Sequence, residues 1–145
     1  MNTLKFKKED KGFSLESSIE INDSLKNVFD FFSEAKNLET LTPDFLNFKI
    51  ITPEPILMKE GLLIDYKIGL HGIPLKWRSE ITKWDPPYSF VDEQRKGPYK
   101  FWHHLHTFKE QDGKTLVLDK VNYGVLGGSI INTVSYTHLT LPTKA

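Results

Sequence analysis

The N-terminal third of the chain carries two different spacings of apolar residues. Apolar and polar positions alternate from Phe13 to Ile21, which is typical of a half-buried strand. The next apolar residues fall at i, i+3, i+4 and i+7, the spacing of one helix face: Leu25, Val28, Phe29 and Phe32. Asp23 or Ser24 can begin this helix, because the side chain of either can accept a backbone N–H as a cap. The pattern predicts a strand followed by an amphipathic helix.

A shorter helical turn is expected around Leu38 to Leu41 and should end before Pro43, because the residue before a proline is pushed out of the α region. From Phe48 onward the apolar period is two. Strand-like runs cover residues 62–70, 75–84, 89–95, 99–109 and 115–123, separated by HGIP, Pro86-Pro87, Gly97-Pro98 and Gln111-Asp112-Gly113. Consecutive strands with short turns are antiparallel, and helices must cover one face of such a sheet. The predicted fold class is α+β.

Composition excludes several classes of protein. The 145 residues suit one domain, and 19 Lys and Arg balance 19 Asp and Glu, so no basic surface indicates a nucleic-acid partner. The chain has no cysteine, which rules out disulfides and thiolate metal sites. No apolar run reaches the roughly 18 residues of a transmembrane helix, and the N-terminus lacks the apolar segment of a signal peptide. We therefore expect a soluble cytoplasmic protein.

The stretch GPYKFWHHLHTFKE, residues 97–110, is rich in histidine. Side chains alternate across a strand, so one face should carry Trp102, His104, His106 and Phe108. His104 and His106 could bind a metal ion, but zinc needs a third or fourth ligand, for which Asp119 is the best candidate. If a four-residue loop joins Lys109 to Lys114, His104 lies opposite Asp119 and His106 opposite Val117. We favour histidines held by hydrogen bonds in a cavity wall over a metal site or an acid–base pair, and predict no metal and no cofactor.

Several of these polar residues should point to the same side of the sheet. Buried polar groups need partners, so an inward polar row within an apolar shell would form a network or bind the polar atoms of a ligand. This row is Asp92, Gln94, His104, His106 and Asp119. Asp92 and Asp119 can equally be interpreted as rim carboxylates in water. The predicted ligand-binding residues are Tyr66, Ile68, Trp77, Asp92, Gln94, Trp102, His104, His106, Phe108 and Tyr123.

Five motifs lie close together in the second half of the chain: W-D-P-P at residues 84–87, F-V-D-x-Q at 90–94, G-P-Y at 97–99, W-H-H-x-H-x-F at 102–108 and D-x-V-x-Y at 119–123. This part resembles the ligand-binding branch of the START-like superfamily, called SRPBCC, which includes polyketide cyclases and coenzyme Q-binding proteins. The resemblance extends weakly over residues 14–134. It implies a helix-grip fold, in which a bent antiparallel sheet wraps around a long C-terminal helix, with a hydrophobic ligand cavity between them.

The C-terminus departs from this family pattern. After GVLGGSIIN the family would continue into the long amphipathic helix, whereas this chain ends in TVSYTHLTLPTKA, which lacks helical apolar periodicity and resembles a foreign translation. We expect a START-like domain over residues 1–134, incomplete at its C-terminus because the long helix is truncated or replaced, and a non-family tail over residues 135–145. Such a domain could form a homo-oligomer through its exposed groove.

Three functions are compatible with these residues and motifs. The preferred one is non-catalytic binding of a small hydrophobic or amphipathic molecule, such as a lipid, a quinone or a polyketide-like compound. The second is a cyclase or dehydratase in which His104 and Asp119 act as a general-base pair. The third is a protein-interaction module whose apolar groove receives a helix of a partner.

Overall fold

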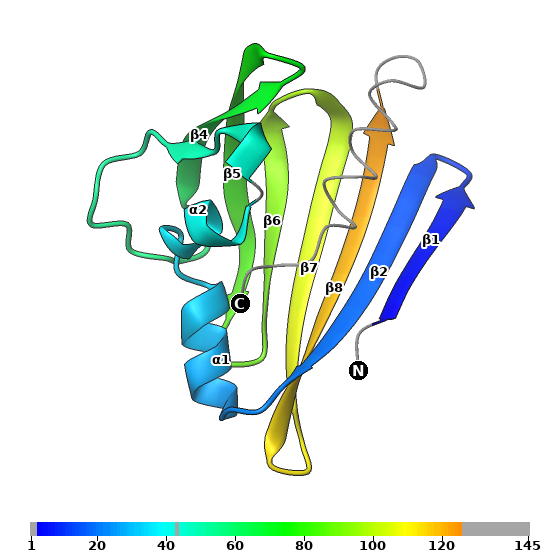
Figure 1. Ribbon diagram of the computed structural model, residues 1–145, viewed down its shortest axis with the longest axis vertical. Helices are drawn as coiled ribbons and strands as arrows, with labels where there is room; N and C mark the ends of the chain where they lie inside the picture. The colour runs from blue at the N-terminus through cyan, green and yellow to red at the C-terminus, as the bar shows by residue number, and fades with distance from the viewer. Residues whose placement is uncertain (1–2, 43, 126–145) are drawn as a thin grey trace.

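The computed structural model describes residues 3–42 and 44–125. Eight antiparallel strands form one curved sheet in the order β1-β2-β8-β7-β6-β5-β4-β3, and the helices lie together on one side of it (Figure 1). The elements are β1 Thr3–Glu9, β2 Gly12–Ile21, α1 Leu25–Phe32, α2 Asn37–Leu41, the 3-10 turn η1 Asp44–Leu46, β3 Lys49–Ile50, β4 Leu63–Leu70, β5 Ile73–Asp85, β6 Ser89–Lys96, β7 Tyr99–Gln111 and β8 Lys114–Val125. This α+β architecture confirms the predicted fold class.

The predicted helices are confirmed. The Ser24 side chain caps α1 by accepting a hydrogen bond from the Asn27 N–H at 3.2 Å. Val28 and Phe29 on its apolar face are buried against the sheet. The second helix, α2, ends at Leu41, as the following proline requires. The strand breaks at Pro86-Pro87 and at Gly97-Pro98 are confirmed as well.

The predicted register between β7 and β8 is wrong by two residues. Asp112 and Gly113 have φ angles of 53° and 76°, so they form a two-residue hairpin turn, and Gln111 pairs with Lys114. His106 therefore lies opposite Asp119 and His104 opposite Val121. A shift of two residues keeps every side chain on its own face, because the strand period is two. The residues predicted to point inward from β7 are therefore unaffected by the error in register.

The apolar pattern does not predict the first strand. β1 pairs with β2 at the edge of the sheet, and every side chain in it is exposed. Charged residues at an edge protect its unpaired backbone groups from other chains. The expected C-terminal departure concerns residues 126–145 and lies outside the described residues. Within residues 3–42 and 44–125, no helix is long and apolar enough to cross a membrane.

Candidate ligand cavity

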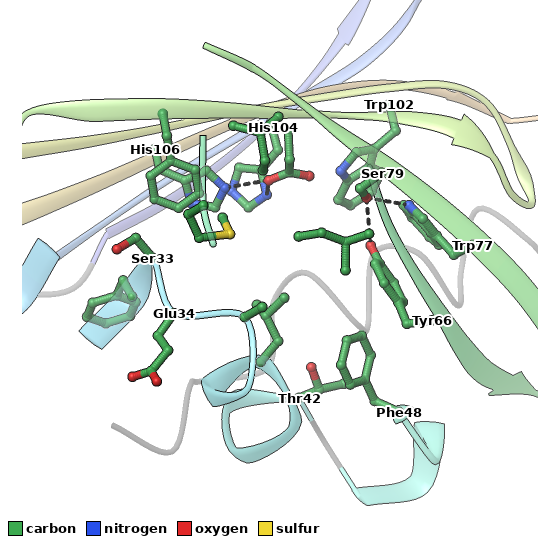
Figure 2. A pocket seen from close by; sticks show the side chains of 18 of the residues that line it. Ser33, Glu34, Thr42, Phe48, Tyr66, Trp77, Ser79, Trp102, His104 and His106 are labelled. Carbon is green, nitrogen blue, oxygen red and sulfur yellow. Dashed lines mark hydrogen bonds and ion pairs between the residues drawn. The ribbon is translucent and has the colours of Figure 1, made fainter. Parts of the chain in front are cut away.

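A cavity of about 180 Å³ lies between the concave face of the sheet and the segments that cover it (Figure 2). The sheet supplies Ile64, Tyr66, Ile68, Trp77, Ser79, Ile81, Phe90, Asp92, Trp102, His104 and His106. The opposite wall comes from the helices and loops, with Phe32, Ser33, Glu34, Ala35, Leu38, Thr42, Phe48 and Met58. The cavity is therefore mainly apolar, and most of its polar groups lie on the sheet side.

Most of the predicted ligand-binding residues line this cavity. Those that do are Tyr66, Ile68, Trp77, Asp92, Trp102, His104 and His106. Alternation along β4, β5 and β7 predicts them correctly as neighbours, because side chains two residues apart share a face. Gln94, Phe108 and Tyr123 lie elsewhere.

Gln94 holds a turn instead of facing the cavity. Its side-chain amide donates to the Tyr99 carbonyl at 2.8 Å, and its oxygen accepts from the Tyr99 N–H at 3.1 Å. A side chain at Gly97 would collide with this amide, so the glycine makes room for it. Gln94 thus satisfies the backbone between β6 and β7.

Phe108 and Tyr123 lie on the predicted face of their strands, but neighbouring side chains cover them and they do not reach the cavity. Phe108 is 1% exposed and packs against Phe29 of α1, with ring centroids 5.1 Å apart. Tyr123 is fully buried next to Trp102 and Tyr99. Both residues belong to the packed core beside the cavity.

His104 and His106 lie side by side on β7 between two carboxylates. Their rings stack with centroids 3.7 Å apart. On one side, His106 Nε2 lies 2.6 Å from Asp92 Oδ2, and His104 Nδ1 lies 3.7 Å from the same oxygen. On the other side, Asp119 Oδ1 lies 3.0 Å from His104 Nε2 and 3.1 Å from His106 Nδ1. Each imidazole is thus bracketed by Asp92 from β6 and Asp119 from β8.

This bracketing sets the charges of the cluster. Burial alone lowers the pKa of His106, but hydrogen bonds to Asp119 and Asp92 outweigh it and raise the pKa to about 9. Burial raises the pKa of Asp119, but hydrogen bonds from His104 and His106 prevail and hold it well below its usual range. The pKa of Asp92 is lowered too, by the hydrogen bond from His106 and the charge of His104, against burial. At neutral pH, His106 is an imidazolium between two carboxylates.

The same residues could offer ligands to a metal ion. One ligand atom each from Asp92, His104 and His106 lies within 4.8 Å of the others. The 2.6 Å contact between Asp92 and His106 is a charge-assisted hydrogen bond, so a metal at this point would have to displace the proton between them. With that proton in place, the two carboxylates bind the imidazoles and are not free to hold an ion.

The sheet wall carries a second polar group, in which Tyr66 and Trp77 are predicted ligand-binding residues and Ser79 is not. Trp77 Nε1 donates to Ser79 Oγ at 3.0 Å, and Ser79 Oγ lies 3.0 Å from the Tyr66 hydroxyl oxygen (Figure 2). Tyr66 stacks on Trp77, and Trp77 meets Trp102 edge to face. Alternation could have paired these residues, since Tyr66 lies opposite Trp77 across β4 and β5.

The wall opposite the sheet is the part of the site that sequence reasoning missed. Ser33, Glu34 and Thr42 lie on the side of the cavity opposite the sheet in Figure 2, and they come from the segment around α1 and α2. Phe48 and Met58 lie outside the helices and strands of the structure and outside the predicted strand-like runs. Of the residues in this wall, Phe32 and Leu38 lie in predicted helices, and the rest lie outside every predicted helix and strand-like run.

The comparisons with known proteins concern the fold. No protein-family model matches the chain, and no curated protein matches it in sequence. Ms6760 from Mycobacterium smegmatis is similar in structure, with a TM-score of 0.63 and 18% identity over 93% of this chain and 85% of that one. Major latex-like protein 151 from Panax ginseng has a TM-score of 0.60 and 14% identity over 87% and 97% of the two chains.

CalU16 from Micromonospora echinospora is similar as well, with a TM-score of 0.59 and 10% identity over 94% of this chain and 80% of that one. At such low sequence identity, similarity in structure shows the fold alone. The chain has the helix-grip α+β fold that its motifs led us to expect.

Proposed function

We propose that this protein binds a small, mainly apolar molecule in the cavity between the sheet and the helices, without catalysing a reaction on it. The observation that carries the proposal is the cavity on the concave face of the sheet, which is lined by aromatic and aliphatic side chains and by a few converging polar groups. Such sites are the usual form of small-molecule pockets.

The volume limits the size of the ligand. An apolar cavity of roughly 150 Å³ accommodates a benzene molecule. At about 180 Å³, the space here suits a molecule of about one or two fused rings, or a short aliphatic chain. A longer ligand would have to extend out of the cavity.

The charged cluster supports positioning of the ligand over acid–base catalysis. The carboxylate of the His104–Asp119 pair also binds His106, whose pKa of about 9 keeps it protonated at neutral pH and unable to act as a general base. The carboxylates that could accept its protons are already engaged with the two imidazoles. A fixed arrangement of this kind orients one polar end of a bound molecule while the apolar walls supply the affinity.

The test uses the three tryptophans as reporters of position. Trp77 and Trp102 line the cavity, whereas Trp84 packs against Phe29 and Phe90 outside it. Titration of the ¹⁵N-labelled protein with indane should shift the indole N–H signals of Trp77 and Trp102 and leave that of Trp84 in place. The variants Trp84→Phe and Trp102→Phe assign the signals.

Two results would contradict the proposal. Binding that moves only Trp84, or no signal, excludes an apolar ligand site at this place. Turnover of an activated carbonyl compound at a pH-dependent rate that His104→Ala abolishes would instead establish the acid–base enzyme. Native mass spectrometry of the protein purified from its own host would then look for the natural ligand.

A further inference from the structure

The polar group on the sheet wall has more hydrogen-bond donors than hydrogen bonds. It consists of Trp77, Ser79 and Tyr66. The indole N–H, the Ser79 hydroxyl and the Tyr66 hydroxyl are three donors, and among the described residues two hydrogen bonds join them. Trp77 can only donate, so Ser79 Oγ accepts its bond. Either Ser79 then donates to Tyr66 and the Tyr66 proton is unused, or Tyr66 donates to Ser79 and the Ser79 proton is unused.

The unused proton faces the cavity in either case, since both hydroxyl residues line it. Ser79 is 3% exposed, so water has little access to its hydroxyl, whereas Tyr66 is partly buried. A buried donor without an acceptor costs free energy, which a ligand that supplies an acceptor recovers. The two hydroxyl oxygens are 3.0 Å apart, so one acceptor atom can reach both.

The surroundings select a neutral acceptor. Burial raises the pKa of Tyr66 well above its usual range, and the negative charge of Asp92 raises it further, so the hydroxyl keeps its proton. The same burial and the same charge oppose a carboxylate or phosphate at this point. A carbonyl oxygen accepts a hydrogen bond without bringing a charge into the cavity.

We infer that the Tyr66–Ser79 pair is a hydrogen-bond donor site for a neutral carbonyl group, and that the ligand is a small apolar ketone, quinone or ester. This inference rests on the proposed function and deepens it. The His–Asp cluster lies further along the same sheet wall, beyond Trp102 (Figure 2). The carbonyl is thus placed at the Tyr66–Ser79 part of the sheet wall.

The experiment uses two probes of the same shape, 1-indanone and indane, which differ in one carbonyl group. Calorimetry measures the affinity of both probes for the wild type and for Tyr66→Phe, Ser79→Ala and the double variant. The proton count predicts an unusual pattern. Tyr66→Phe leaves the Ser79 hydroxyl free, and Ser79→Ala leaves the Tyr66 hydroxyl free, so each single variant should lose less than about 3-fold in affinity for 1-indanone.

Because Ser79→Ala also frees the Trp77 N–H, the double variant is made in the Trp77→Phe background, where no donor is left at this place, and it should lose on the order of 10-fold for 1-indanone relative to Trp77→Phe. Its affinity for indane should stay within about 2-fold, which also reports an intact cavity. The infrared carbonyl band of bound 1-indanone should lie at lower frequency in the wild type than in the double variant, because a hydrogen bond weakens the C=O bond. The matched control Ser14→Ala/Tyr88→Phe removes the same groups outside the cavity and should leave both affinities and the band unchanged.

The outcomes separate the inference from the proposed function. If both probes bind and the double variant changes neither their affinity ratio nor the carbonyl band, the donor site is refuted while the apolar pocket stands. If neither probe binds, the pocket itself is refuted and the inference falls with it. A double variant that fails to bind indane is replaced by Tyr66→Phe/Ser79→Cys, in which the weak S–H donor keeps the volume near that of serine.

Discussion

Phe108 and His106 stand two residues apart on the same face of β7, yet one is in a filled core and the other in the wall of a cavity. Phe108 lies beneath α1, where Phe29 contacts it, and Phe90 and Val117 complete a buried cluster. His106 faces space that the segment after α1 encloses without filling. The sheet offers the same geometry at both positions, so the difference lies in what covers it.

The comparison shows how a short helix creates a pocket. α1 ends at Phe32, and the chain then turns through Ser33 and Glu34 before α2 begins. Where the helix face lies on the sheet, large aromatic rings interdigitate at core density. Beyond its end, the covering residues include the small side chains of Ser33, Ala35 and Thr42, and the polar groups of the sheet line the cavity.

Phe29→Ala should have the largest effect of the changes considered, because Phe29 is 2% exposed and contacts Trp84, Phe90 and Phe108. We expect a loss of about 3–5 kcal/mol in the free energy of unfolding, as for other buried phenylalanines. Urea unfolding measures it. The neighbouring Phe31, which is 36% exposed, provides the control, and Phe31→Ala should cost less than about 1 kcal/mol. Equal losses for the two variants would show that Phe29 of α1 is not packed against the sheet in solution.

The His–Asp cluster in the cavity wall should make the free energy of unfolding depend on pH. Because the pKa of His106 is raised from 6.5 to about 9, its stabilisation is complete below pH 6.5 and is lost as the pH rises toward 9. The lowered pKa values of Asp92 and Asp119 add stabilisation that is present above pH 3.8 and lost at lower pH. The free energy of unfolding should therefore be greatest between about pH 4 and 6.5 and fall by up to about 3 kcal/mol by pH 9. Denaturant titrations at stepped pH measure this, and a flat profile above pH 6.5 would argue against the bracketed imidazolium.

Asp119→Asn should remove about 2 kcal/mol from the free energy of unfolding at pH 6, because it takes one carboxylate from the partly buried cluster. It should also flatten the loss of stability at high pH, since the pKa of His106 falls toward its usual value. Asp30→Asn is the matched control on the surface, where the Lys26–Asp30 pair is exposed. The control should cost about 0.5 kcal/mol or less and leave the pH profile unchanged.

The sequence predicted the part of the site that lies on regular strands. Alternation places Trp102, His104 and His106 on one inward face, and this holds despite the wrong register, because the error is an even number of residues. The true register depends on Asp112 and Gly113 forming a tight turn, whereas the predicted register requires a four-residue loop. Turn geometry thus decides which residue pairs with Asp119, and apolar spacing alone could not.

Two other features could not be predicted from apolar periodicity. β1 exposes both of its faces, and its apolar alternation is limited to Leu4 and Phe6, too short to identify a strand. Gln94 has an inward position in the pattern, but its amide finds a closer partner in the Tyr99 backbone. Local hydrogen bonds of this kind depend on the path of a turn, which is set by the folded backbone.

The smallest effect should come from the same change made in the filled core and in the cavity wall, Ile19→Val and Ile68→Val. Both isoleucines are partly buried on strands, Ile19 against the filled cluster and Ile68 on the cavity wall. We expect Ile19→Val to cost about 1 kcal/mol in the free energy of unfolding, because the lost methyl group leaves a void among packed neighbours. Ile68→Val should cost about half as much, since part of its surface already faces empty space and has no contacts to lose. Urea unfolding of the two variants measures this difference, and an equal cost at both positions would mean that the cavity closes around Ile68 in solution.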